Sequence, residues 1–259
     1  MQITRYEIKT NKLNRELRIA CVSDLHGRKV PAAIEAVKAI KPDIILLAGD
    51  ILEISVDYMS ARNQNALSFL KDIAQIAPTY YCFGNHEIYF SHAKKGQSRV
   101  SDPALLEENL KAIKALGIHV VNDCFESADN GISIGGVVCG YDKDSQDARN
   151  CPDQAVLKEF DAKEDYKILL CHYPHYYEQY LKHTNFDLIL SGHAHGGQWR
   201  IFGRGVYAPH QGLFPKFTSG MYDDRFIINR GAANNVAPFP RFFNPCEVLD
   251  IRIKPANDN

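Results

Sequence analysis

Residue types that bind metal ions follow five short apolar runs of this chain. The runs end in Ser23-Asp24-Leu25-His26, Gly49-Asp50, Gly84-Asn85-His86-Glu87, His172 and Gly192-His193-Ala194-His195. Ligands bind outside the carboxyl ends of sheet strands, so five strand ends can bring these groups to one place although they are far apart in sequence. Imidazole and carboxylate together suit transition metals. The pattern predicts one polyvalent metal site and, with it, a hydrolase.

The first two motifs are weak signals when each is taken alone. Asp24 and His26 are two residues apart and would share a face of an extended strand. The alternative is a turn at the strand end, capped by Asp24. Asp50 has two carboxylate oxygens and could bridge two cations.

The later motifs are more specific. Asn85 is an unusual but workable neutral oxygen ligand, and the alternative is a turn in which Asn85 caps the next helix. His86 would point into the same crevice without binding metal, which makes it a candidate acid for the leaving group. His172 alone would be read as a core histidine, but it stands at a strand end of the same kind. His193 and His195 are flanked by glycines that permit close backbone approach.

The segments around these motifs alternate between strand-like and helix-like patterns. Strands are expected near 17–22, 44–48, 80–83, 167–171 and 188–190, and helices near 32–40, 63–76, 103–116, 153–160 and 174–182. Such alternation indicates βαβ units with parallel pairing. A meander of short strands is expected between 118 and 139, and two strands near 225–229 and 247–253 close the fold. We expect one mixed α/β domain over residues 1–259.

The composition and the N-terminal sequence indicate which partners and which cellular compartment to expect. A formal net charge of -1 over 259 residues provides no general field for nucleic acid, so none is expected as a partner. Residues 1–9 lack the pattern of a secretory signal, and no stretch approaches the roughly 20 apolar residues of a membrane span. The seven cysteines include no C-x-x-C pair, which is typical of reduced core residues. These features predict a cytoplasmic protein.

The ordered set D-x-H, G-D, G-N-H-E, a lone H and G-H-x-H resembles the calcineurin-like metallophosphoesterase superfamily, over residues from about 17 to 200. The resemblance implies a four-layer α/β/β/α sandwich with two mixed β-sheets and the metal site at the carboxyl ends of the strands. It also implies two divalent metal ions, for which Mn²⁺, Fe and Zn²⁺ all suit the mixed nitrogen and oxygen ligands.

Carried over residue by residue, the resemblance divides the ligands between two metals. One metal takes Asp24, His26, Asp50 and His195, and the other takes Asp50, Asn85, His172 and His193. Asp50 is then the bridge. A water between the ions would lose a proton and attack phosphorus, while His86, outside the ligand set, would serve the leaving oxygen. The implied activity is phosphoric ester hydrolysis, with a phosphodiester as the leading substrate class.

The second motif separates this chain from one branch of the superfamily. Protein Ser/Thr phosphatases extend it to G-D-x-V-D-R-G, whereas residues 49–55 read G-D-I-L-E-I-S, which argues against a protein phosphatase. Glu53 falls where that branch has the carboxylate that orients the catalytic histidine. We therefore predict a hydrogen bond from Glu53 to His86 that supports catalysis.

The C-terminal part is similar to a group of bacterial phosphodiesterases often tied to the membrane, including enzymes that cleave UDP-2,3-diacylglucosamine. The resemblance rests on 191–198, 208–209, 218–222 and 229–231. It implies a small phosphodiester or, as an alternative, a lipid-linked pyrophosphate substrate. A nuclease and a non-catalytic scaffold are the weaker alternatives.

Two loops, 91–102 and 199–222, are expected to set the specificity. The segment 199–217 is aromatic, apolar and basic. It either contacts a membrane peripherally or folds its aromatic side chains against the domain.

Overall fold

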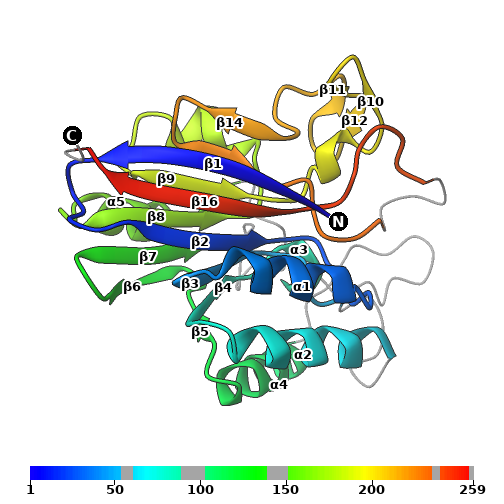
Figure 1. The fold of residues 1–259 in the computed structure, drawn as a ribbon, viewed down its shortest axis with the longest axis horizontal. Helices are drawn as coiled ribbons and strands as arrows, with labels where there is room; N and C mark the ends of the chain where they lie inside the picture. Colours follow the sequence, from blue (N-terminus) through cyan, green and yellow to red (C-terminus); the bar gives the residue numbers. More distant parts are fainter. Residues whose placement is uncertain (54–60, 89–102, 139–150, 235–239, 257–259) are drawn as a thin grey trace.

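Two six-stranded β-sheets pack face to face, with helices on their outer faces (Figure 1). The computed structural model describes residues 1–53, 61–88, 103–138, 151–234 and 240–256. The loop 91–102, expected to contribute to specificity, lies outside the described residues. Within the described chain, no helix has the length and apolar character needed to cross a membrane.

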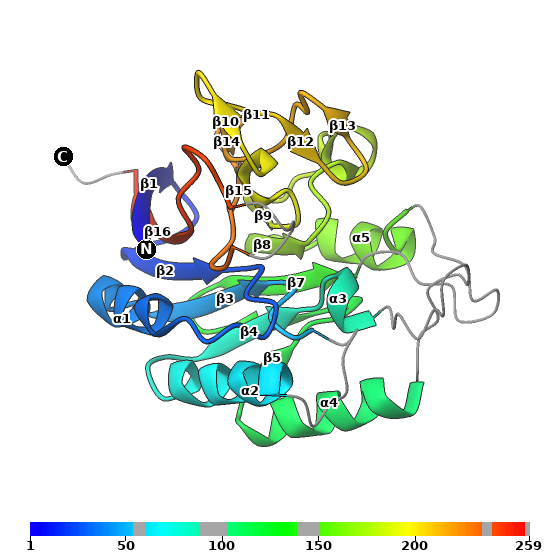
Figure 2. The ribbon, with the colours of Figure 1, turned by 90° about the vertical axis from the view of Figure 1, so that its right-hand side faces the viewer.

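The first sheet has the strand order β1-β16-β2-β3-β4-β5. Its strands are β1 (Gln2–Thr10), β16 (Glu247–Pro255), β2 (Leu17–Val22), β3 (Ile44–Ala48), β4 (Thr79–Cys82) and β5 (His119–Val120). β16 runs antiparallel to β2, and the other neighbours are parallel. Helices α1 (Pro31–Ile40), α2 (Ala61–Ala74) and α4 (Pro103–Ala115) lie on its outer side (Figure 2).

The second sheet has the order β14-β15-β9-β8-β7-β6. Its strands are β14 (Gly220–Tyr222), β15 (Phe226–Ile228), β9 (Leu188–Ser191), β8 (Tyr166–Cys171), β7 (Ile132–Val137) and β6 (Cys124–Ala128). The two edge pairs are antiparallel and the inner pairs are parallel. Helix α5 (Gln154–Asp161) and the π-helix η1 (Tyr177–Leu181) lie on its outer face.

The side chains of β8 show how the layers are stacked. Ile168 and Leu170 belong to the core shared with the first sheet, whereas Leu169 and Cys171 pack in a second cluster with Phe160 of α5. A strand buried on both faces needs a continuous apolar run, which explains why β8 shows no polar alternation. The expected mixed α/β fold with two mixed sheets is confirmed.

Several local predictions differ from the structure. The expected meander is wrong, because β5 joins the first sheet while β6 and β7 form an antiparallel pair in the second. Strand β1 was not anticipated. The helix expected over 174–182 is a five-residue π-helix, 177–181. The segment after 196 forms two small hairpins, β10 (Arg200–Ile201) with β11 (Arg204–Gly205) and β12 (Tyr207–Ala208) with β13 (Gly212–Leu213). The single domain over 1–259 stays a prediction.

Candidate metal centre

The loops after β2, β3, β4, β8 and β9 meet between the two sheets and are joined by backbone hydrogen bonds. Asp24 N donates to Gly49 O at 3.0 Å, and Gly192 N donates to His172 O at 3.2 Å. These bonds tie the loops together in pairs within each sheet. A bond from His193 N to Asp24 Oδ1 at 3.0 Å then links the two sheets. All seven predicted ligand residues are buried here.

One group of candidate ligands comprises Asp50, His172 and His193. Both chain neighbours of Asn85 contact this group, since Gly84 packs against Asp50 and His172, and His86 N donates to Asp50 Oδ1. His172 Nδ1 donates to Ala48 O at 2.6 Å, which leaves the lone pair on Nε2. That nitrogen lies 3.0 Å from Asp50 Oδ2. Two ligand atoms that each lie about 2.1 Å from one ion are about 3.0–3.4 Å apart. The spacing of this nitrogen and oxygen therefore suits a shared cation.

Three atoms of this group have no hydrogen-bond partner among the described residues. They are Asn85 Oδ1, His172 Nε2 and His193 Nε2, all buried. Leaving a buried polar atom unsatisfied costs about 1–3 kcal/mol. A divalent cation would satisfy all three together with Asp50, so the residues present fit a metal ion. The short helix α3 (Asn85–Ile88) begins at Asn85. This residue therefore starts a helix and still presents its side-chain oxygen, Oδ1, without a hydrogen-bond partner among the described residues.

The other group comprises Asp24, His26 and His195. His195 Nε2 lies 3.3 Å from Asp24 Oδ1 and 3.2 Å from His26 Nε2. Asp50 Oδ2 lies 3.9 Å from His26 Nε2, so the same oxygen that faces His172 also faces this group. Asp50 thus occupies the position between the groups that a bridging ligand requires.

Arg241 is a neighbour of the site that the motifs do not reveal. Its Nη2 donates to His195 Nδ1 at 3.0 Å and to Ala233 O at 2.6 Å. A donor at Nδ1 favours the tautomer of His195 with the proton on Nε2. Binding of a cation by that Nε2 therefore requires the contact with Arg241 to rearrange.

His86 and Glu53 form a pair at the edge of the site. His86 Nδ1 lies 2.8 Å from Glu53 Oε1, the contact that the predicted orienting role requires. Glu53 Oε2 also lies 3.2 Å from His26 Nδ1, so the carboxylate connects a candidate ligand with the candidate acid. His86 is partly exposed, unlike the ligand candidates. The catalytic roles of both residues stay predictions.

Burial and neighbouring charges shift the pKa values of the titratable groups in different directions. Burial would lower the pKa of His86, but Asp50 and Glu53 outweigh it and raise this pKa to about 9. Burial raises the pKa of Asp24, and repulsion by Asp50 adds to the effect. Burial also acts to raise the pKa of Asp50, yet the imidazoles of His172 and His86 hold it well below the usual value.

Glu87 organises the loops, a role that its place in the G-N-H-E motif does not reveal. Its carboxylate accepts from Asp50 N at 2.9 Å, Leu52 N at 3.0 Å and Gly84 N at 2.7 Å. The Tyr81 hydroxyl donates to it at 2.5 Å. The fourth letter of the G-N-H-E motif thus fixes the backbone on both sides of Asp50.

Five of the seven ligand candidates have left-handed backbone. They are Asp24, His26, Asp50, His193 and His195, with φ between 47° and 66°. Each such residue costs about 1–2 kcal/mol in an ordinary setting, and strain of this kind clusters at functional sites. Gly84 permits the close packing, because a Cβ there would collide with Asp50 Oδ1.

The fold and the site define a two-sheet α/β protein with a buried set of candidate metal ligands at the carboxyl ends of its strands. The model of the calcineurin-like phosphoesterase family matches residues 17–197. The chain belongs to this family. The match spans every predicted ligand, His86 and Glu53, and ends before the hairpins β10–β13.

Curated relatives agree with this assignment. An uncharacterized metallophosphoesterase of Helicobacter pylori is 26% identical over 99% of this chain and 65% of its own length. One from Aquifex aeolicus is 27% identical over 98% of this chain and 92% of its own length. Phosphodiesterase YaeI of Escherichia coli is 28% identical over 71% of this chain and 62% of its own length. The chain therefore spans about two thirds of the Helicobacter relative.

Proposed function

We propose that this protein is a metal-dependent phosphodiesterase with a dinuclear centre. The observation that carries the proposal is the set of buried candidate ligand atoms: Asn85 Oδ1 and His193 Nε2 have no hydrogen-bond partner among the described residues, and His172 Nε2 lies 3.0 Å from Asp50 Oδ2. Asp24, His26 and His195 would hold the second ion. The bound ions would supply an activated water and neutralise charge on the phosphoryl oxygens, a role that Mn²⁺, Fe or Zn²⁺ can fill.

His86 would act on the leaving group. The negative charges of Asp50 and Glu53 keep it protonated near neutral pH, and Glu53 holds its Nδ1. The Nε2–H is then the proton that can be transferred to the leaving oxygen. Asp50 also accepts from the backbone N–H of His86 at 2.9 Å, so this contact links the backbone of His86 to the carboxylate that would bridge the ions.

The substrate class we propose is a small phosphodiester, in keeping with the name of the Escherichia coli relative. A nucleotide-sugar or lipid pyrophosphate remains the second candidate, and no nucleic acid is expected at a net charge of -1. We also propose a cytoplasmic location. The exposed apolar side chains of 199–217 provide separate support for a membrane contact.

Metal analysis combined with a substrate panel tests the proposal. We expect the purified protein to contain a transition metal by mass spectrometry and to cleave bis-p-nitrophenyl phosphate after Mn²⁺ addition. The panel would compare phosphomonoesters, diesters, cyclic nucleotides and nucleotide-sugar pyrophosphates. Absence of both bound metal and cleavage would refute the metallophosphodiesterase, and strong preference for a pyrophosphate would select the second candidate.

A further inference from the structure

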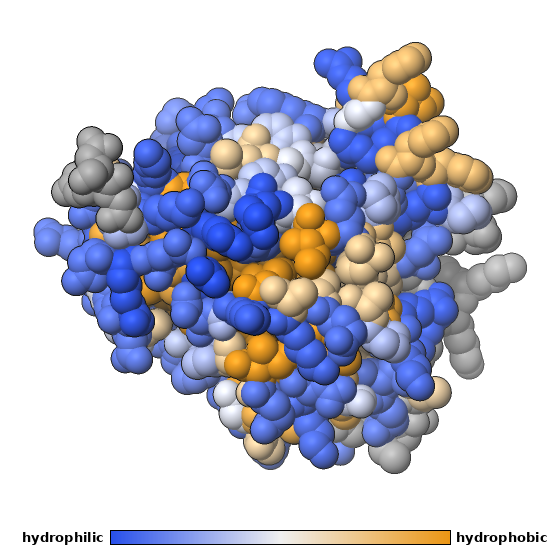
Figure 3. Space-filling model, in the orientation of Figure 1, coloured by the Kyte–Doolittle hydropathy of each residue, from blue (hydrophilic) through white to orange (hydrophobic). Residues whose placement is uncertain are grey.

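Exposed aromatic side chains gather on the hairpins that follow the metal-binding loop. Of the large apolar residues exposed in the described chain, most lie in two short stretches, 201–214 and 242–243. The two stretches are adjacent, since Arg200 N donates to Phe242 O at 3.1 Å and Trp199 pairs with Phe242. We call them together the aromatic platform. Orange and pale orange side chains project there at the upper right of Figure 3.

Three phenylalanines of the platform combine exposure with unfavourable backbone. Phe202, Phe214 and Phe243 are 102%, 70% and 88% exposed, and their φ angles are 49°, 50° and 52°. Left-handed backbone is rare for a bulky residue and costs about 1–2 kcal/mol. Folding alone would favour glycine or asparagine at such positions, and it gains nothing from side chains that face water. The combination indicates that these rings serve an interaction.

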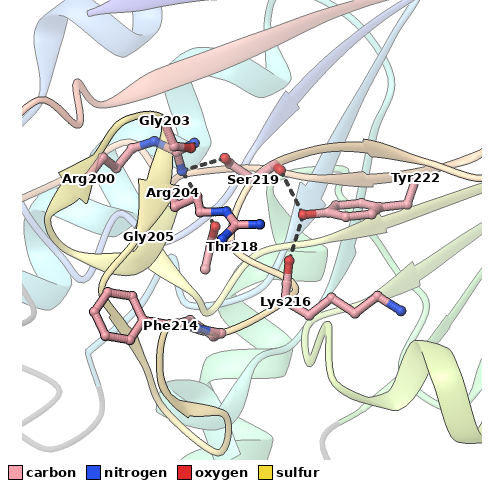
Figure 4. Close-up of a pocket in the computed structure, with 10 residues that line it drawn as sticks. Arg200, Gly203, Arg204, Gly205, Phe214, Lys216, Thr218, Ser219 and Tyr222 are labelled. Atoms are coloured by element: carbon pink, nitrogen blue, oxygen red, sulfur yellow. Dashed lines mark hydrogen bonds between the residues drawn. The ribbon is translucent and has the colours of Figure 1, made fainter.

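A basic hollow lies beside the rings. It has a volume of about 440 Å³ and is lined by residues that include Arg200, Arg204, Lys216 and Phe214 (Figure 4). Arg200 donates to neutral acceptors, Gly196 O at 3.0 Å and Ser219 Oγ at 2.6 Å, so these contacts leave its charge uncancelled. Within the described chain, Arg204 has no carboxylate partner. Lys216 is paired with Glu178 at 2.6 Å.

Apolar rings next to cationic groups match one surface in particular. An anionic bilayer offers a hydrocarbon boundary for aromatic side chains and phosphate groups for guanidinium, and each cation near it contributes about 1 kcal/mol. We propose that the aromatic platform docks this protein on the surface of a membrane that contains anionic lipids. The rings of Phe202, Phe214 and Phe243 insert, while Arg200 and Arg204 face the lipid phosphates.

The platform is built directly on the metal-binding loop. Val206 N donates at 3.1 Å to the backbone oxygen of Gly197, and Gly197 follows His195 by two residues. Asn244 Nδ2, next to Phe243, donates to His195 O at 2.7 Å. Docking would therefore hold the metal centre at the membrane surface. The placement of the metal centre at the membrane rests on the proposed function. It implies substrates that reside in, or next to, the lipid layer.

Vesicle binding tests the docking without any measurement of activity. The full chain would be mixed with vesicles of phosphatidylcholine alone or with phosphatidylglycerol, followed by flotation and by fluorescence of Trp199, the single tryptophan, which pairs with Phe242 of the platform. We expect binding and a blue shift with the anionic vesicles. Replacement of each phenylalanine by asparagine should weaken binding about tenfold. Asparagine tolerates left-handed backbone, so these variants should fold at least as well as the wild type.

One further variant tests the electrostatic contribution to vesicle binding, and another serves as a control. Arg204→Gln should weaken binding to the anionic vesicles about fivefold and leave the weak binding to pure phosphatidylcholine unchanged. Ile3→Thr removes an exposed apolar side chain from β1, which is not part of the platform, and should bind like the wild type.

Three results would overturn the proposal. These are absence of vesicle binding by the wild type, equal binding by the Phe→Asn variants, and self-association of the wild type that the Phe→Asn variants abolish. The last result would assign the platform to contact between two copies. Cleavage of bis-p-nitrophenyl phosphate in solution should be unaffected by the Phe→Asn variants, so failure of docking and failure of the proposed phosphodiesterase are distinguishable.

Discussion

Left-handed backbone occurs in the metal centre and in the aromatic platform, but on different kinds of residue. In the metal centre it falls on buried polar residues such as Asp24 and Asp50, whose neighbours hold them by hydrogen bonds. In the platform it falls on Phe202 and Phe214, which are exposed. Strain in the first region is offset by internal contacts. In the platform Phe214 N also donates to Val206 O at 2.8 Å, but the rings of Phe202 and Phe214 are largely exposed. An external partner therefore explains the phenylalanines better.

The largest effect should come from the carboxylate between the two ligand groups. Asp50→Asn removes one negative charge from the position that faces both His172 and His26. We expect loss of both metals and a fall in turnover of about 10³-fold or more, measured by metal analysis and cleavage of bis-p-nitrophenyl phosphate. Asp43→Asn is the matched control, because this exposed carboxylate precedes the same strand, β3, at its other end. Retained metal in Asp50→Asn would contradict the bridging role.

A smaller loss is expected from the partly exposed imidazole. His86→Gln should keep the bound metals and lower kcat by about 10²–10³-fold, because a proton donor is lost while the ligand set is intact. The test compares kcat for substrates with good and poor leaving groups, and the poor ones should suffer more. His86 also lies with His26 and Glu53 in a group that could bind an ion. Reduced metal content in His86→Gln would place His86 among the ligands.

Acid should weaken metal binding by competition. In the metal-free protein, burial acts to lower the pKa of His172, but Asp50 outweighs it and raises this pKa to about 9. A cation must displace that proton, so the affinity for Mn²⁺ should fall by up to about tenfold for each pH unit below 9. Calorimetric titrations of the metal-stripped protein at several pH values would measure this. Docking on vesicles uses no such group and should change far less over the same range.

The same pKa values predict the opposite trend for folding without metal. His86 and His172 have folded-state pKa values of about 9, above the ordinary histidine pKa of 6.5. Their contribution to the free energy of unfolding is therefore complete below pH 6.5 and is lost as the pH rises through 9. Urea unfolding of the metal-stripped protein should show this decline, while stabilisation by added Mn²⁺ should grow with pH. A pH-independent free energy of unfolding would contradict the raised pKa values.

The convergence of the candidate ligands was predictable from sequence for a physical reason. Parallel strands such as β2, β3 and β4 end at one edge, so polar residues after apolar runs converge without knowledge of the sheet order. Arg241 lies far along the chain in no motif, and only tertiary structure brings it to His195. Glu87 stood inside a recognised motif, but its role needed the geometry of the loop around Asp50.

The platform was less predictable than the metal centre. The sequence left open whether the aromatic residues of 199–217 are buried or exposed, and the structure divides them. Phe217 is buried, whereas Phe202 and Phe214 are exposed. Hairpins of two-residue strands such as β10 and β11 give no detectable periodicity. The sign of φ at each phenylalanine depends on these turns and appears only in the structure.

The smallest effect distinguishes backbone strain from side-chain contacts in the platform. Phe202→Asn should raise the free energy of unfolding by about 1 kcal/mol, because asparagine tolerates φ near 49° and the exposed ring has no packing to lose. Phe202→Ala is the control, since alanine removes the same ring but keeps the steric cost of left-handed backbone. It should leave stability nearly unchanged, and both variants should weaken vesicle binding equally, by about tenfold. Urea unfolding gives the stabilities. A destabilised Phe202→Ala would mean that the ring packs against the protein, and the contrast between the two regions would then disappear.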